Sequence, residues 1–125
     1  MSFKTTMIAT TTLCGALSIV LMVTPALIYF LFEVTPHESG TFFARRAAVM
    51  FFGVATTAFL ARGISELAAQ HAIALGLGVM MLGLAILGLF EMARGMAGPG
   101  ILIAVVTEIA FAAAFLRLLR TTKSA

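Results

Sequence analysis

The stretch G-I-L-I-A-V-V-T-E-I-A-F-A-A-A-F-L, from Gly100 to Leu116, is long and apolar and carries one carboxylate, Glu108, close to its middle. Three further segments are similarly apolar, and hydrophobic residues make up 62% of the sequence. Soluble proteins average about 45–50%. A single domain of 125 residues cannot hide so much apolar surface from water. The sequence therefore predicts a protein embedded in a lipid bilayer.

Four segments are predicted to cross the membrane as helices within one domain, residues 1–125. A hydrocarbon core of about 30 Å needs about 20 apolar residues at about 1.5 Å each. The second segment has only 15 uncharged residues, but the arginines at its ends can reach outward to the headgroups. The first is too long for a secretory signal, so we expect it to be retained. The prediction is an all-α, antiparallel four-transmembrane-helix bundle with spans at about residues 8–32, 44–62, 71–90 and 99–119.

Proline, glycine and charge mark the breaks between these spans. Pro25 should kink the first span and leave a backbone carbonyl one turn earlier without its usual partner. Residues 33–41 are expected to form a polar loop, and residues 91–99 a turn whose proline can start the last helix. Arg62 and Glu66 are four residues apart and would pair if the second helix continued that far.

The distribution of basic residues predicts the orientation. Four crossings place both termini on one side, and that side holds five basic residues against three on the other. The positive-inside rule therefore predicts that both termini lie in the cytoplasm. The five are Lys4, Arg62, Arg117, Arg120 and Lys123, and the three are Arg45, Arg46 and Arg94.

Glu108 is the residue whose position demands a physical reason. A charged carboxylate at mid-bilayer costs at least about 2.5–3.5 kcal/mol. We therefore expect the side chain to face the other helices and to be protonated, because burial disfavours the charged form. Small residues at four-residue intervals around it, namely Gly100, Ala104 and Ala112, form a ridge suited to close helix packing.

Hydrogen-bond partners for Glu108 are expected from the first two spans, because the third has no polar side chain. The candidates are Thr56 and Thr57 in the second span and Ser18 and Thr24 in the first. Two interpretations stand at this point. The acid either accepts a proton or anchors a cationic or hydroxylated ligand, or it is a neutral acid that fixes the register of the helices.

Aromatic and basic residues near the start of the second span predict contact with lipid headgroups. Phe42 and Phe43 precede Arg45 and Arg46, an order that suits rings at headgroup depth and guanidinium groups on phosphate. Arg62 is interpreted in the same way at the other end of this span. Arg45 and Arg46, beside Phe42 and Phe43, are also the best candidates for contact with a quinone headgroup.

Several classes of function are disfavoured. The basic residues are scattered, so we expect no nucleic-acid partner. His37 and Glu38 lack a third ligand for a metal, no histidine lies inside a span to hold haem, and no hydrolase or phosphate-loop motif is present. Cys14 is interpreted as a packing thiol. We therefore expect no cofactor, no metal and no catalytic residue.

Four stretches are distinctive: L-x-V-T-P-A-L at Leu21–Leu27, F-F-A-R-R-A-A at Phe42–Ala48, A-F-L-A-R at Ala58–Arg62 and G-P-G-I-L-I-A-V-V-T-E at Gly98–Glu108. Together they resemble a family of small bacterial four-helix membrane proteins known only as a domain of unknown function. More distantly, the layout is similar to the DoxX-like membrane proteins, some of which are linked to quinone-dependent sulfur oxidation. The resemblance implies a four-helix membrane bundle and carries over no activity.

Together with the resemblance, these observations favour a four-helix bundle in a bacterial inner membrane with a non-catalytic role, as an accessory or scaffold subunit or as a binder of lipid-like ligands. Its expected partners are membrane lipids and either a larger membrane complex or further copies of the same chain. One alternative is a small oligomeric transporter or proton-coupled carrier that uses Glu108. Another is a membrane subunit of a quinone-linked oxidoreductase.

Overall fold

The computed structural model describes residues 2–123, with side chains as far as Arg120. Over this range the chain forms five α-helices, one short 3-10 turn and no strand, which confirms the all-α prediction. The elements are α1 (Phe3–Val23), α2 (Pro25–Phe32), α3 (Glu38–Ala61), α4 (Leu67–Ala93), η1 (Pro99–Ile101) and α5 (Leu102–Lys123).

Four helical segments are long and apolar enough to cross a membrane: α1, α3, α4 and the segment Pro99–Arg120. They contain 21, 24, 27 and 22 residues, and at about 1.5 Å per residue each covers a hydrocarbon core of about 30 Å. The chain is therefore a multi-pass membrane protein.

The first apolar run is two helices rather than one kinked helix. Thr24 has φ −140° and ψ 68°, outside the helical region, because a residue before proline is disfavoured there. Pro25, which has no N–H to donate, begins α2. Whereas the expected span covered about residues 8–32, α1 runs from Phe3 to Val23. Its early start follows from Ser2, whose hydroxyl accepts a hydrogen bond from the Thr5 amide at 3.2 Å.

The bounds of α3 also differ from the expected loops. The helix begins at Glu38, so the last part of the predicted polar loop is helical. It ends at Ala61 and does not continue to Glu66, so the helical geometry needed for pairing with Arg62 is absent. Arg62 instead stacks on Phe59, with its Cζ 3.7 Å from the ring centroid, and donates a hydrogen bond to the Phe59 carbonyl.

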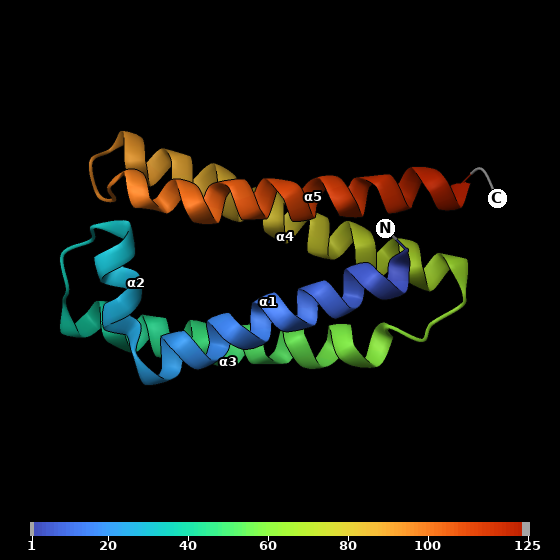
Figure 1. Cartoon of the computed structure of the whole chain (residues 1–125), viewed down its shortest axis with the longest axis horizontal. Coiled ribbons are helices and arrows are strands. Elements are labelled where there is room, and N and C mark those ends of the chain that lie inside the picture. The colour runs from blue at the N-terminus through green and yellow to red at the C-terminus, as the bar shows by residue number, and fades with distance from the viewer. Residues whose placement is uncertain (1, 124–125) are drawn as a thin grey trace.

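The four long helices associate as two pairs, α1 with α3 and α4 with α5. Figure 1 shows these pairs as two layers, with α4 and α5 above and α1 and α3 below. The pairs come together at their two ends. At one end the start of α1 approaches α5, and at the other end α2 reaches across to η1.

The buried core lies toward the end where α1 begins. One cluster of buried side chains there combines residues from all four long helices and joins the two pairs. Its members are Phe3, Met7 and Cys14 of α1, Ala55, Ala58 and Ala61 of α3, Ala74 and Met81 of α4, and Phe115 and Leu118 of α5.

Small and hydroxylated residues bring α1 and α3 close together. The Thr11 hydroxyl donates to the Met7 carbonyl in its own helix, at 2.8 Å, and lies 3.4 Å from the Ala55 carbonyl of α3. Thr6 and Thr10 are fully buried, and each donates to a carbonyl one turn earlier. Their polar groups are thus satisfied inside apolar surroundings, as close packing in a membrane requires.

Two glycines join the pairs at the opposite end. The Gly98 N–H donates to the Phe32 carbonyl at 2.7 Å, so η1 is held directly on the end of α2. Gly100 lies so close to the Leu31 carbonyl that a β-carbon there would overlap the carbonyl oxygen. This contact is between backbones, and only a residue without a β-carbon allows it.

Candidate functional site

The seam between α4 and α5 holds the one carboxylate that lies near the middle of a span. Gly88 lies against Val105, and Gly78 lies against Phe115. In an antiparallel pair this register places Ala85 opposite Glu108. Ala85 is only 2% exposed, so the seam is tight at this level.

Glu108 lies inside this seam with an unsatisfied oxygen. The residue as a whole is half-buried, but its Oε2 is buried and has no hydrogen-bond partner. An unpaired charge in such surroundings is strongly disfavoured, and a neutral acid is the form that burial permits. Burial of this atom agrees with the expected orientation toward the other helices, while the rest of the residue stays partly exposed.

The hydroxyl residues expected to pair with Glu108 lie elsewhere. Thr56 is exposed on α3 and donates to the Phe52 carbonyl of its own helix at 2.9 Å. Thr57 is also exposed on α3, and Thr24 is exposed at the break between α1 and α2. Ser18 is buried on α1, whose main neighbour is α3. None of them supplies a hydrogen bond to Oε2 of Glu108.

The small residues spaced around Glu108, namely Gly100, Ala104 and Ala112, do not all pack against the same helix. Gly100 meets the Leu31 carbonyl at the end of α2. Ala104 and Ala112 are half-buried farther along α5, whose main partner is α4. The four-residue spacing therefore marks the inward side of α5, but it does not mark one contact surface.

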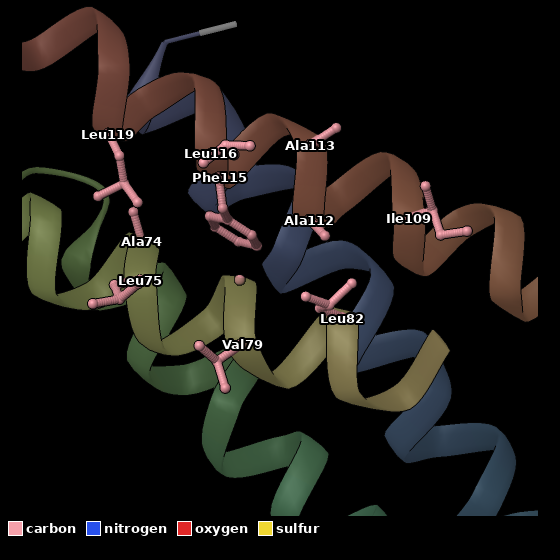
Figure 2. Close-up of a pocket in the computed structure, with 11 residues that line it drawn as sticks. Ala74, Leu75, Val79, Leu82, Ile109, Ala112, Ala113, Phe115, Leu116 and Leu119 are labelled. Atoms are coloured by element: carbon pink, nitrogen blue, oxygen red, sulfur yellow. The ribbon is translucent and has the colours of Figure 1, made fainter. Parts of the chain in front are cut away.

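An apolar groove of about 350 Å³ runs along one side of the α4–α5 pair. All of its lining residues are apolar, and Figure 2 shows Phe115 pointing from α5 toward α4 at its centre. Leu75, Val79 and Leu116 line it and are each more than half exposed, so the groove opens outward from the pair. The small side chains Ala112 and Ala113 leave the space on the α5 side.

The predicted headgroup residues gather at the start of α3. The rings of Phe42 and Phe43 pack edge to face with centroids 5.4 Å apart. The Arg46 Cζ lies 5.9 Å from the Phe42 centroid, within the range of a cation–π contact. All three are exposed. Arg45 is also exposed and lines a shallow hollow with His37 and Glu38.

Arg62 lies at the far end of α3, where its guanidinium stacks on Phe59. It is therefore separated from the other predicted headgroup residues by the length of the helix. Within residues 2–123, no three potential metal ligands lie together.

Two features of the site escaped prediction from the sequence. The first is the groove, for which the run of small residues Ala112–Ala114 on α5 and the glycines of α4 were the available signal. The second is the pairing of Glu108 with Ala85. The short connection between α4 and α5 already favours an antiparallel pair, and the three- and four-residue spacing Val105, Glu108, Ala112 is that of a helix–helix seam.

Comparison with protein-family models, with curated proteins and with solved structures finds no match to this chain. The functional proposals therefore stand on the chain's own geometry.

Proposed function

We propose that the chain is a non-catalytic membrane protein that holds one hydrocarbon chain of a lipid-like ligand in the α4–α5 groove. The observation that carries this proposal is the groove itself, about 350 Å³ and apolar on every side. Ligand sites typically occupy about 300–1,000 Å³ and are lined mainly by apolar groups. Its outward opening allows a molecule dissolved in the bilayer to enter sideways.

Replacing Ala113 with phenylalanine is expected to reduce ligand binding severalfold. Ala113 lines the groove, and a ring there would fill the space that the ligand occupies. The measurement is mass spectrometry of the lipids that remain with the protein after gentle extraction in polymer-bounded membrane discs. Each lipid is quantified relative to the bulk membrane.

Ala16→Phe is the matched control, because Ala16 is exposed on α1, in the other helix pair. This variant should retain the wild-type ligand. Equal enrichment in both variants would contradict binding in the groove, as would a wild-type lipid profile identical to that of the bulk membrane. A quinone among the retained molecules would favour the quinone-linked oxidoreductase subunit, because a polyisoprenoid tail suits the same groove.

A larger assembly is part of the same proposal. In each span, only 17–28% of an apolar stretch of 18 residues is buried within the chain. Most of the helix surface is therefore available to lipids, to a partner protein or to further copies. The exposed cluster of Phe42, Phe43, Arg45 and Arg46 suits the headgroup region of lipids. Native mass spectrometry of the extracted protein gives copy number and partner together.

A proton-coupled carrier is the second candidate, and the unpartnered Oε2 of Glu108 favours it. If the chain transports a solute with protons, Glu108→Gln should abolish proton-driven uptake into vesicles, because an amide cannot exchange a proton. If the chain only binds lipids, the same variant should be as stable as the wild type and should retain the same ligand. Uptake by wild type that persists in Glu108→Gln would exclude this carrier mechanism.

We further propose a bacterial inner membrane with both termini in the cytoplasm. The start of α1, the α3–α4 connection and the end of α5 lie at one end of the molecule (Figure 1). That end carries the larger number of basic residues, which the positive-inside rule associates with the cytoplasmic side of an inner membrane. A fluorescent protein fused after Ala125 should fluoresce in cells, whereas alkaline phosphatase fused there should be inactive. The reverse pattern would invert the assignment.

A further inference from the structure

Glu108 stands apart from every other ionisable group of the spans. Along α4, its neighbour in the seam, no ionisable side chain lies between His71 and Glu91. Ala85, which lies opposite Glu108, offers only a methyl group and a backbone already used by its helix.

The other helices add little charge at this depth. Along α1 and α2 the only ionisable side chain between Lys4 and Tyr29 is Cys14, and α3 has none between Arg46 and Arg62. On α5 the nearest cation is Arg117, nine residues from Glu108 and hence about 13 Å away along the helix axis at about 1.5 Å per residue. No basic side chain is therefore placed to neutralise Glu108 as a carboxylate.

We propose that Glu108 is a proton-binding site in the membrane interior, held as a neutral acid and reached from the lipid phase. Three observations carry the proposal together: the burial of Oε2, its lack of a hydrogen-bond partner, and the half-buried state of the whole residue. Binding a proton removes the cost of an unpaired buried charge. Because Oε2 has no partner, no protein hydrogen bond must break when this oxygen gains or loses its proton.

A protonated carboxyl group in the membrane interior can be identified by its reaction with a carbodiimide. A lipid-soluble carbodiimide dissolves in the bilayer and reacts with protonated carboxyl groups. The Glu108 oxygen bonds to the central carbon of the reagent while the acid proton moves to a reagent nitrogen. The resulting O-acylisourea rearranges by transfer of the acyl group from oxygen to nitrogen, which gives a stable N-acylurea. No atom leaves and no oxidant or reductant is needed.

The test uses the whole protein in lipid vesicles treated with dicyclohexylcarbodiimide or, separately, with a water-soluble carbodiimide and a soluble amine. Peptide mass spectrometry should locate the lipid-soluble reagent on Glu108, and labelling should fall as the pH rises. The water-soluble reagent should leave Glu108 unmodified and label exposed acids such as Glu38 and Glu66. Glu38→Gln is the matched control and should leave the Glu108 adduct unchanged, whereas Glu108→Gln should remove it.

Infrared difference spectra between wild type and Glu108→Gln measure the proton directly, without any need for the reagent to enter. At neutral pH the wild type should show the C=O stretch of a protonated carboxyl, and the variant should lack it. A difference spectrum that contains only carboxylate bands would overturn the proposal. Absence of an adduct on Glu108 in folded wild-type protein would overturn access from the lipid phase. Both readouts are independent of whether the α4–α5 groove holds a ligand.

Discussion

Gly100→Ala is expected to separate α2 from η1 and to open the end of the molecule at which these elements meet. A β-carbon at position 100 would lie 2.9 Å from the Leu31 carbonyl carbon and would overlap the carbonyl oxygen. The overlapping atom belongs to the backbone of Leu31, which cannot change rotamer as a long side chain can. Overpacking of this kind costs about 1–3 kcal/mol. The overlap can be removed only if the two helix pairs move apart at this end. The hydrogen bond from Gly98 to Phe32 would then be lost as well.

Spin labels on α2 and α5 measure this opening. Phe30 and Ile103 are 79% and 66% exposed, so cysteines there accept labels without disturbing the packing, and pulsed electron resonance gives the distance between them. In Gly100→Ala that distance should lengthen and its distribution broaden. Gly76→Ala is the control, because a β-carbon at Gly76 meets nothing within 4 Å. Identical distributions in the two variants would show that the α2–η1 contact does not hold the pairs together.

Ala58→Leu is expected to destabilise the α1–α3 pair by about 1–3 kcal/mol through overpacking. Ala58 is fully buried and lies one turn beyond Ala55, whose carbonyl is 3.4 Å from the Thr11 hydroxyl of α1. At this separation a leucine cannot fit unless α1 moves away. The free energy of unfolding, measured by denaturation in mixed micelles of dodecyl sulfate and a mild detergent, should fall by this amount.

The matched control for this prediction is Ala16→Leu on α1. Ala16 is exposed, so the larger side chain enters surroundings that accept it, and the free energy of unfolding should stay close to that of the wild type. If the two variants are equally stable, close packing of small residues does not hold α1 against α3. If both are destabilised, the exposed side of α1 must be covered by another chain.

The number and length of the spans were predictable because they depend on composition along the chain. An apolar run of about 20 residues crosses a bilayer in helical form whatever its neighbours are, since its backbone groups are satisfied within the helix. The break at Thr24 was predictable only in part. A proline inside the run predicts an irregularity, but whether it becomes a kink or a break depends on what α2 packs against.

The environment of Glu108 was predictable only in part. Its position near the middle of a span gives a strong reason for burial, and burial of Oε2 agrees with that reason. Its neighbours were not predictable, because the sequence offers four hydroxyl residues as candidates and does not choose among them. The structure places Ala85 opposite it, through the register of Gly88 with Val105 and Gly78 with Phe115.

By itself, the sequence determined that the chain is all-α, that it forms four membrane-crossing helices, and that one acid lies among them. Only the tertiary structure decided that the helices form two pairs, which side chains meet in each seam, and where the apolar groove lies. The physical reason is the solvent. In water, an apolar stripe marks the face of a helix that will be buried, but lipid and protein interior are similarly apolar, so hydrophobicity does not distinguish the packed face from the exposed one. The packed face is determined instead by small residues and close backbone contacts, such as that of Gly100 with Leu31. The partners in these contacts become known only when the helices are placed together.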